Sequence, residues 1–334
     1  MKKNKKVSVI GAGAWGTALA AAFARAGNDV IIWAMEKQVV SEINSRHINS
    51  MYLKGIKLPD NITAVNKIED AIDVNVIVLV PPAQFMRSTC EQIAKLKLGQ
   101  SVPLVICSKG VEKFSLKLMS EVVEEILPKN PIAILSGPSF ADEVGKDMPT
   151  AVTCACKDDK IAKALAEVLS SDNFRIYTTT DVIGAQIGNA VKNVIAIACG
   201  IAKGRGMGNN ATAAIITRGL AEMRRLGKAK GGENETMMGL AGAGDIILTC
   251  SSDQSRNFSL GFALGKGVKL EDIMKERGSM VTEGVHSAQS VIDLARSLNI
   301  DMPICQAVYG ILYKNKDVLE TANHLMNRPL KQED

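Results

Sequence analysis

A glycine-rich turn near the start of the chain constrains the fold more than any other feature. A β-branched run at residues 7–10 leads into GAGAWG at 11–16, an alanine-rich stretch follows, and DVIIWA at 29–34 reads as a second strand. This order is the strand–GxGxxG–helix–strand setting of the dinucleotide-binding fingerprint. A bare GxGxxG is a weak signal, but in this setting it predicts a dinucleotide-binding α/β domain.

Each glycine has its own task in that motif. Gly11 allows the tight turn, Gly13 lets a pyrophosphate approach the backbone, and Gly16 lets the helix pack closely on the strand. The N-terminus of the helix then offers free N–H groups to the phosphates. We therefore expect a dinucleotide to bind at this turn.

The rest of the first half alternates between strand-like and helix-like patterns. Strand-like runs occur at 75–80, 103–107, 132–135, 151–156 and 174–177. Amphipathic helical stretches lie between most of them, at 85–97, 116–127 and 161–169. The alternation predicts an α/β fold with a Rossmann-type, doubly wound and largely parallel sheet that has helices on both faces.

Strand signals cease after Thr180, and residues 182–330 read as helices joined by Gly-rich connections. At 334 residues, the chain is long enough for two domains with cores of their own. We expect a dinucleotide-binding Rossmann domain over residues 1–188 and an all-helical, substrate-binding C-terminal domain over residues 189–334.

Composition restricts the classes of function. The chain has 46% hydrophobic and 22% charged residues, as an ordinary soluble globular protein does. Aromatic residues make up only 4%, so no nucleic-acid surface of stacked bases is expected. The net charge of +5 suits an anionic metabolite as readily as a polymer. The seven cysteines show no metal-ligand or disulfide spacing, which predicts reduced thiols, no metal and a cytoplasmic location.

The N-terminus imitates a secretion signal, because four lysines precede the uncharged residues 7–24. The internal glycines and the strand pattern after Gly27 fit a signal peptide badly. We therefore expect this segment to be part of the folded domain.

Lys192 is the only charged residue in the apolar segment 182–202. A lone ammonium in a buried helix must pair, reach solvent, or occupy a site with a lowered pKa. Three interpretations without catalysis are a lysine reaching solvent at a helix edge, a buried ion pair and a membrane span. The polar residues of the segment argue against a span; they are Gln186, Asn189 and Asn193. The functional interpretation is a catalytic lysine.

Three turns follow directly after predicted strands, where ligands collect in doubly wound sheets. They are Pro81-Pro82, the SKG turn at 108–110 and the SGPSFA turn at 136–141. Each alone reads as an ordinary surface turn, but three at one edge of the sheet favour a site.

Two further candidates lie in the helical half. Asp245 follows a Gly-Ala-Gly turn, and Ser255, Arg256 and Asn257 precede an apolar stretch. Ser255 is suited to cap a helix whose first turn would bind a phosphate, with Arg256 adding charge-assisted hydrogen bonds. A capped helix with an exposed arginine is an equally good interpretation of this segment.

Six motifs, in this order, resemble the NAD(P)-dependent sn-glycerol-3-phosphate dehydrogenase family in its bacterial form, over nearly the whole chain. The motifs are GAGAWGTALA at 11–20, SKG at 108–110, LSGPSFADEV at 135–144, KNVIAIACGIA at 192–202, GLAGAGDIILTCSSDQSRN at 239–257 and VTEGV at 281–285. Their order and spacing are much more specific than the glycine fingerprint alone.

The resemblance implies reversible hydride transfer between NADH or NADPH and dihydroxyacetone phosphate, giving sn-glycerol 3-phosphate for phospholipid synthesis. It places Lys192 at the proton donor and acceptor position. The implied substrate positions are Lys109, Gly137, Ser139, Lys192, Asp245, Ser255, Arg256 and Asn257. The implied cofactor positions, with the three glycines of the turn, are Ala14, Trp15, Met35, Lys109, Ala141, Arg256, Val281 and Glu283.

Ketone reduction needs a hydride at carbon and a proton at the developing alkoxide. A cationic Lys192 would stabilise and protonate that oxygen, and its apolar setting would lower its pKa towards the working range. Lys109 would bind the same oxygen or hold the substrate against the nicotinamide. Asp245 would orient Lys192 or accept a hydrogen bond from a substrate hydroxyl, while Arg256 and the Asn257 turn would bind the phosphate.

Cofactor preference stays open because one position departs from the family pattern. Met35 stands where family members usually carry Arg or His, the cation that favours the 2′-phosphate of NADP. Glu36 follows it and suits the free ribose hydroxyls of NAD, although Lys37 would suit a phosphate.

Two other hypotheses compete with this family. One is an oxidoreductase of the same architecture for a hydroxy acid or a sugar phosphate, which should lack the Ser255–Asn257 phosphate site. The other is a nucleotide-sensing protein without catalysis, against which Lys109, Lys192 and Asp245 argue. A homodimer is expected only as the common default.

Overall fold

The computed structural model describes residues 4–277, 283–330 and 332, and the chain divides into two compact units. The sheet unit comprises Met1–Glu112 and Lys117–Val182, and the helical unit comprises Lys113–Leu116 and Ile183–Asp334. The division falls at the start of helix α7 (Val182–Gly204), so the expected boundary between residues 188 and 189 lies inside that helix.

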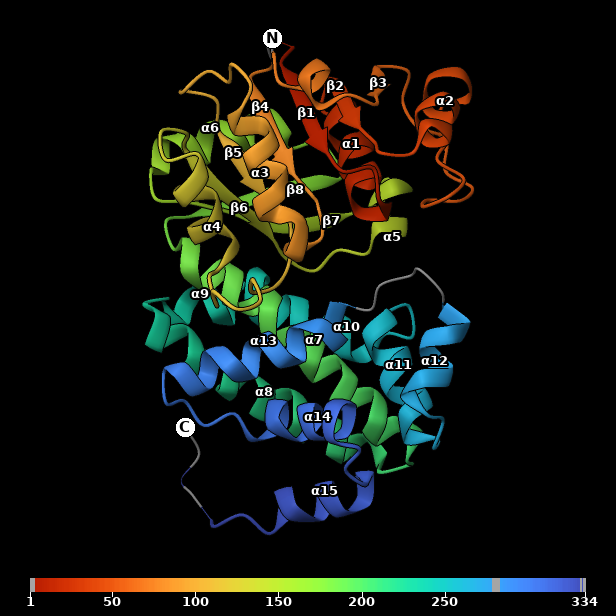
Figure 1. Cartoon of the computed structure of the whole chain (residues 1–334), viewed down its shortest axis with the longest axis vertical. Helices are drawn as coiled ribbons and strands as arrows, with labels where there is room; N and C mark the ends of the chain where they lie inside the picture. Colours follow the sequence, from red (N-terminus) through yellow and green to blue (C-terminus); the bar gives the residue numbers. More distant parts are fainter. Residues whose placement is uncertain (1–3, 278–282, 331, 333–334) are drawn as a thin grey trace. The chain divides into compact units, whose positions relative to one another are not determined.

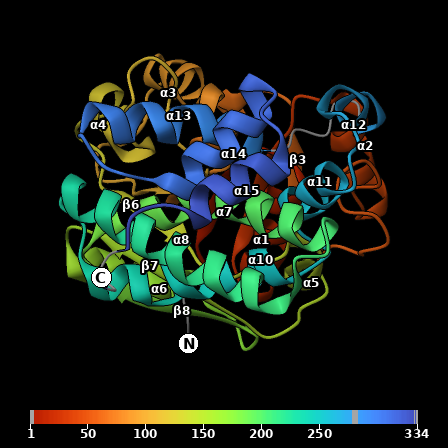
Figure 2. The same cartoon turned by 90° about the horizontal axis from the view of Figure 1, so that it is seen from below.

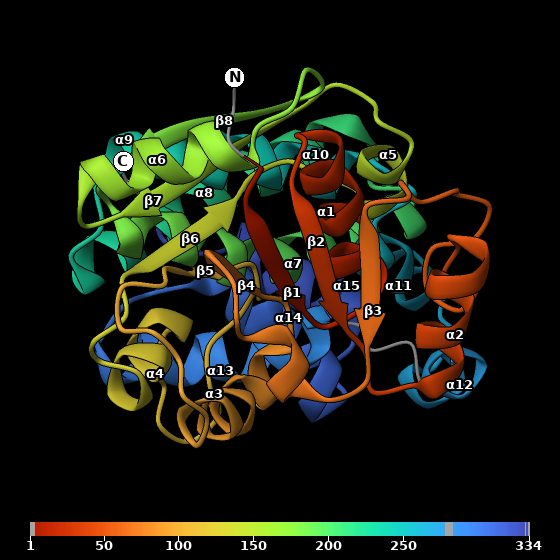
Figure 3. The same cartoon turned by 90° about the horizontal axis from the view of Figure 1, so that it is seen from above.

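The described part of the sheet unit contains one eight-stranded sheet with the order β3-β2-β1-β4-β5-β6-β7-β8 (Figure 3). The strands are β1 (Lys6–Ile10), β2 (Asp29–Trp33), β3 (Ile62–Val65), β4 (Val76–Leu79), β5 (Leu104–Ile106), β6 (Ile132–Ser136), β7 (Thr150–Cys156) and β8 (Phe174–Thr179). All neighbours pair in parallel except β6 and β7, which are antiparallel. The first six strands have the Rossmann order, which confirms the expected fold class.

Helices cover both faces of this sheet, as the alternating pattern predicts. They are α1 (Ala14–Arg25), α2 (Lys37–Arg46), α3 (Met86–Ala94), α4 (Met119–Ile126), α5 (Ala141–Gly145) and α6 (Asp159–Leu169), with short 3₁₀ turns η1 (Ile68–Ala71) and η2 (Ala83–Phe85). Helices α1 and α6 lie over one face, and α3 and α4 lie over the other (Figure 3). The central strand β4 is therefore apolar along its whole length, and every one of its residues is buried.

The sequence pattern did not predict strand β3. It has four residues, of which only alternate ones are buried, and polar Asn61 and Asn66 flank it. A run this short carries little periodicity, so its pairing with β2 decides its structure.

The helical unit contains, over its described residues, the expected succession of helices (Figure 1). They are α7, α8 (Gly208–Lys230), α9 (Asn234–Met238), the π-helical turn η3 (Leu240–Gly244), α10 (Asp245–Ser251), α11 (Arg256–Gly265), α12 (Leu270–Arg277), α13 (Glu283–Ser297), α14 (Pro303–Lys314) and α15 (Val318–Met326). Helix α14 lies beside α13, α8 and α15 (Figure 2).

Helix α7 is the core helix of this unit. Among described helices it alone is long and apolar enough to cross a membrane, and 94% of its most apolar window is buried within the protein. Glycines let its backbone approach neighbouring helices: a Cβ at Gly188 would overlap the carbonyl of Ala241, and one at Gly200 would overlap that of Phe258. Close packing of this kind fixes α7 relative to η3 and α11.

Candidate active site

The glycine turn between β1 and α1 has the geometry that a pyrophosphate needs. Gly11 has φ +118°, a conformation that L side chains rarely adopt. Apart from the adjoining backbone, none of the described residues has an atom within 4 Å of the place where a Cβ of Gly13 would stand, so this backbone can be approached closely. A Cβ at Gly16 would overlap the Gly11 carbonyl, so only glycine permits this packing of helix on turn. The residues present therefore fit a dinucleotide.

Helix α1 begins at Ala14, and its N-cap residue is Gly13. Because glycine has no side chain, no N-cap side chain occupies the N–H groups of the first turn. The indole Nε1 of Trp15 is buried and has no hydrogen-bond partner among the described residues. A buried donor is normally paired, so this orphaned N–H is consistent with a ligand at the turn.

Two residues that the sequence did not single out hold this turn in place. The buried amide of Asn49 donates to the Ala12 carbonyl (2.9 Å) and to Thr17 Oγ1 (2.8 Å). Thr17 in turn donates to the Ala12 carbonyl (3.1 Å). Asn49 lies after α2, far from the turn in sequence, and no local pattern indicates its contact.

The loop after β2 carries the residues that bear on cofactor preference. Met35 is 74% exposed, and Tyr52 donates a hydrogen bond from its hydroxyl to Glu36 Oε1 (2.8 Å). Asn66, after β3, donates to the carbonyls of Ala34 and Met35 (both 2.8 Å). The carboxylate of Glu36 is thus held in place beside an exposed, uncharged side chain.

Other candidates of the sheet unit also follow carboxyl ends of strands. Lys109 is half-buried after β5, and neighbouring Ser108 donates to the Pro81 carbonyl. Gly137 follows β6 with φ +147°, Ser139 donates to its carbonyl (3.0 Å), and Ala141 begins α5.

In the helical unit, Lys192 forms an ion pair with Asp245, the first residue of α10. Lys192 is 3% exposed and Asp245 is 1% exposed, so the pair is removed from solvent. Thr249 donates from Oγ1 to the backbone carbonyl of Asp245 (2.6 Å). Of the two roles expected for Asp245, the structure contains the contact with Lys192, so the buried ion pair considered for Lys192 is present.

Asn193, the next residue of α7, connects three helices. Asn257 Nδ2 donates to Asn193 Oδ1 (2.9 Å), and the N–H of Gly284 donates to Asn257 Oδ1 (2.9 Å). Asn193 Nδ2 also donates to Glu283 Oε2 (3.5 Å). The side chain of Asn257 is therefore engaged inside the protein and fixes the start of α11, a role that its sequence context did not reveal.

Ser255 caps α11 as expected, because its side chain accepts the N–H of Phe258 (3.2 Å). Arg256 is exposed at the first position of the helix. This local geometry fits a phosphate site and a plain capped helix equally well. Val281, the remaining cofactor candidate, lies outside the described residues.

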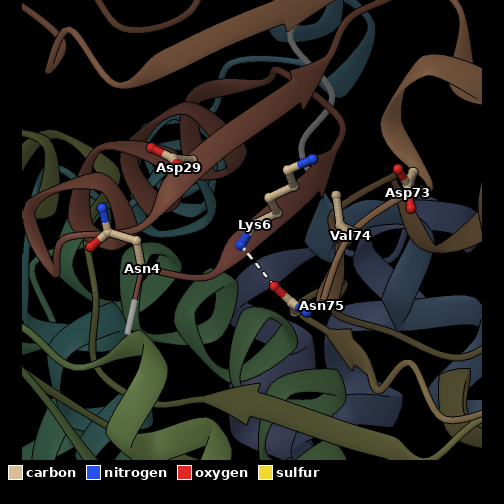
Figure 4. A pocket seen from close by; sticks show the side chains of 6 residues that line it. All are labelled: Asn4, Lys6, Asp29, Asp73, Val74 and Asn75. Atoms are coloured by element: carbon tan, nitrogen blue, oxygen red, sulfur yellow. Dashed lines mark hydrogen bonds between the residues drawn. The ribbon is translucent and has the colours of Figure 1, made fainter. Parts of the chain in front are cut away.

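Two hollows among the described residues lie elsewhere. One of about 400 Å³ is lined by residues that include Lys6, Asp29 and Asn75, and the backbone N–H of Lys6 donates to Asn75 Oδ1 (3.0 Å; Figure 4). The other, of about 520 Å³, shares Val74 and Asn75 with it. Both lie at the amino ends of the parallel strands, opposite to the glycine turn, so neither is the expected cofactor site.

The chain is similar to known proteins over almost its entire length. Residues 6–162 match the family described as NAD-dependent glycerol-3-phosphate dehydrogenase N-terminus, and residues 181–323 match the corresponding C-terminus. A glycerol-3-phosphate dehydrogenase (NAD(P)+) from Caulobacter vibrioides is 50% identical over 329 residues, 98% of this chain and 99% of the relative. The enzyme of that name from Parvibaculum lavamentivorans is 48% identical, with 98% of each chain covered.

Solved structures give the same result. Glycerol-3-phosphate dehydrogenase from Coxiella burnetii superposes with a TM-score of 0.92 at 37% identity, covering 97% of this chain and 99% of that one. The enzyme from Saccharomyces cerevisiae has a TM-score of 0.85 at 30% identity, covering 96% and 99%. The chain therefore belongs to the NAD-dependent glycerol-3-phosphate dehydrogenase family.

Proposed function

We propose that the chain reduces dihydroxyacetone phosphate to sn-glycerol 3-phosphate reversibly, with Lys192 as the proton donor and acceptor. The observation that supports this role is the buried ion pair of Lys192 with Asp245 in a chain of this family. An ion pair buried for structural reasons alone would add little to the stability of the fold, because the cost of desolvating both charges offsets much of their attraction.

The dinucleotide would be held by the turn at 11–16 and the start of α1, with Glu36 at the ribose. When bound, the cofactor supplies or accepts the hydride. Lys109, Gly137, Ser139 and Ala141 follow strand ends of the same unit, so we assign them to the cofactor and substrate side of this edge.

Lys192 would act at the C2 oxygen of the substrate. The ammonium donates a hydrogen bond to the ketone and transfers its proton as negative charge develops on that oxygen. The neutral amine that remains removes the proton again in the reverse direction. Asp245 would hold Lys192 in position and favour its charged form before transfer.

The phosphate would bind at the start of α11. Backbone N–H groups of the first turn and the guanidinium of Arg256 provide the positive potential, and Ser255 shapes the cap. Asn257 would act mainly through its backbone, because its side chain already links Asn193 and Gly284.

The cellular setting is also a proposal. A cytoplasmic enzyme that feeds phospholipid synthesis fits the seven cysteines, which are all free and buried. A homodimer is proposed as the commonest symmetric assembly.

The test is an assay of the purified protein that follows NADPH and NADH oxidation with dihydroxyacetone phosphate. Turnover with at least one cofactor supports the proposal. A lack of turnover with both, alongside measurable cofactor binding, would leave the nucleotide-sensing alternative; turnover with a hydroxy acid alone would favour the other oxidoreductase.

A further inference from the structure

One buried polar side chain on α7 has no use in the scheme above. Asn189 is 2% exposed, and its Oδ1 has no hydrogen-bond partner among the residues that the structure describes. A buried amide oxygen without a donor destabilises the folded protein, since the oxygen has lost its water. Such atoms are rare in native proteins, and one at a candidate site points to a ligand that supplies the donor.

The position of Asn189 on α7 relates it to the proton-transfer residue. It precedes Lys192 by three residues and Asn193 by four, and side chains at these spacings share one face of a helix. The neighbouring residue, Gly188, packs against the carbonyl of Ala241. The turn η3 therefore covers the side of α7 next to Asn189.

The contacts along α7 have a definite order. The start of α11 is tied to Asn193 through Asn257, and α11 runs from there towards the C-terminal end of α7. Lys192 and its ion pair come next, and Asn189 lies one turn further towards the N-terminus. The start of α11, the proton donor and Asn189 Oδ1 thus follow one another along the length of α7.

The substrate has the same order of groups. Dihydroxyacetone phosphate carries its phosphate on C3, its ketone on C2 and a hydroxyl on C1. With the phosphate at the start of α11 and the C2 oxygen at Lys192, the C1 hydroxyl extends towards Asn189. That hydroxyl is a donor, and Asn189 Oδ1 is an acceptor to which no described residue donates.

We propose that Asn189 Oδ1 accepts a hydrogen bond from the C1 hydroxyl of the substrate and makes the enzyme selective for ketone phosphates that carry this hydroxyl. The inference rests on the proposed function. Asn189 is a binding residue in this scheme, and proton transfer remains with Lys192.

The test is a cycle of two enzymes and two substrates. Wild type and Asn189→Ala are assayed with dihydroxyacetone phosphate and with acetonyl phosphate, which has hydrogen in place of the C1 hydroxyl. We expect kcat/KM of the wild type to fall about tenfold on loss of the hydroxyl. Asn189→Ala should lose about as much with dihydroxyacetone phosphate, but nothing further with acetonyl phosphate.

Ser290→Ala is the matched control. Ser290 is also buried in the helical unit, and its hydroxyl also has no partner among described residues. This variant should keep kcat/KM for both ketones within about twofold of wild type. Thermal melting checks folding: removal of an unsatisfied polar group should leave the Tm of Asn189→Ala equal or higher.

Equal losses for both ketones in Asn189→Ala would overturn the inference, and so would unchanged kinetics. An effect confined to the Kd of the nicotinamide cofactor, measured by calorimetry, would also overturn it. Failure of the wild type to reduce dihydroxyacetone phosphate would be a different result, because it refutes the proposed function itself.

Discussion

Lys192 and Asp245 form an ion pair in which neither side chain is more than 4% exposed. The two residues lie on α7 and α10 of one unit, and Gly188 of α7 packs against Ala241 of η3, the turn that leads directly into α10. A charge pair enclosed in this way is sensitive to the loss of either partner, because the remaining charge stays buried.

Lys192→Ala should lower kcat by roughly 100- to 10,000-fold, because it removes the proton donor. The Kd for NADH or NADPH, measured by calorimetry, should change little. Lys203→Ala is the control, since Lys203 is exposed on the same helix. Activity of Lys192→Ala near that of wild type would remove its catalytic role. A lowered Tm is expected as well, since Asp245 loses its partner.

Arg256→Ala should raise KM for dihydroxyacetone phosphate by roughly 10- to 100-fold, because a charge-assisted hydrogen bond to phosphate is lost. Lys266→Ala, at the exposed other end of α11, should leave KM unchanged. Steady-state kinetics of both variants with dihydroxyacetone phosphate measure this change in KM. An unaltered KM in Arg256→Ala would support the plain capped helix in place of a phosphate site.

Glu36→Gln should improve NADPH binding relative to NADH by about tenfold, because a carboxylate at the ribose repels the 2′-phosphate. Titration calorimetry gives both dissociation constants. Glu91→Gln, at an exposed position on α3, should not alter their ratio. If the ratio is the same in wild type and Glu36→Gln, the carboxylate does not lie at the 2′-position.

Glu222 should make stability depend on pH. It accepts the backbone N–H groups of Ile304 (2.6 Å) and Cys305 (3.1 Å), and burial raises its pKa from 4.5 to about 7. The folded state therefore binds a proton more tightly than the unfolded state does. This stabilisation is complete below pH 4.5 and is lost as pH rises through about 7.

Urea unfolding between pH 5 and 8 checks this prediction. The free energy of unfolding of wild type should fall by up to about 3 kcal/mol from this group alone as pH rises. Glu222→Gln should lack that part of the slope, whereas Glu271→Gln, at an exposed position on α12, should retain it. Parallel slopes in wild type and Glu222→Gln would contradict the raised pKa.

Local patterns predicted most of the sheet unit. The glycine turn, the buried strand β1 and the alternation of strands and helices depend on neighbours in the sequence, and the structure confirms them. The pattern could not reveal that β7 runs antiparallel to β6, because strand direction depends on how a connection crosses the sheet. The short strand β3 was missed for the related reason that its partner, β2, defines it.

The candidate site likewise contains residues that a local sequence pattern indicates and residues that it does not. Lys192 stood out because it is a lone charge in an apolar segment, and Ser255 because it precedes a helix, so each had a local signal. Asn49, Asn193 and Thr249 act through partners elsewhere in the fold or through a backbone carbonyl, and their side chains are common in ordinary helices and loops. The family resemblance supplied the reaction, which the family match confirms, but it did not supply these contacts.

The backbone contacts between α7 and α11 have a mechanical consequence. A Cβ at Gly200 would overlap the Phe258 carbonyl, and one at Gly261 would overlap that of Ile197, so the two helices touch reciprocally without compressible side chains between them. A displacement of α11 is therefore passed directly to the part of α7 that follows Lys192. In the scheme proposed above, this contact holds the phosphate-binding residues of α11 and the proton-transfer residue of α7 at a fixed separation, so the site would select ligands by their length.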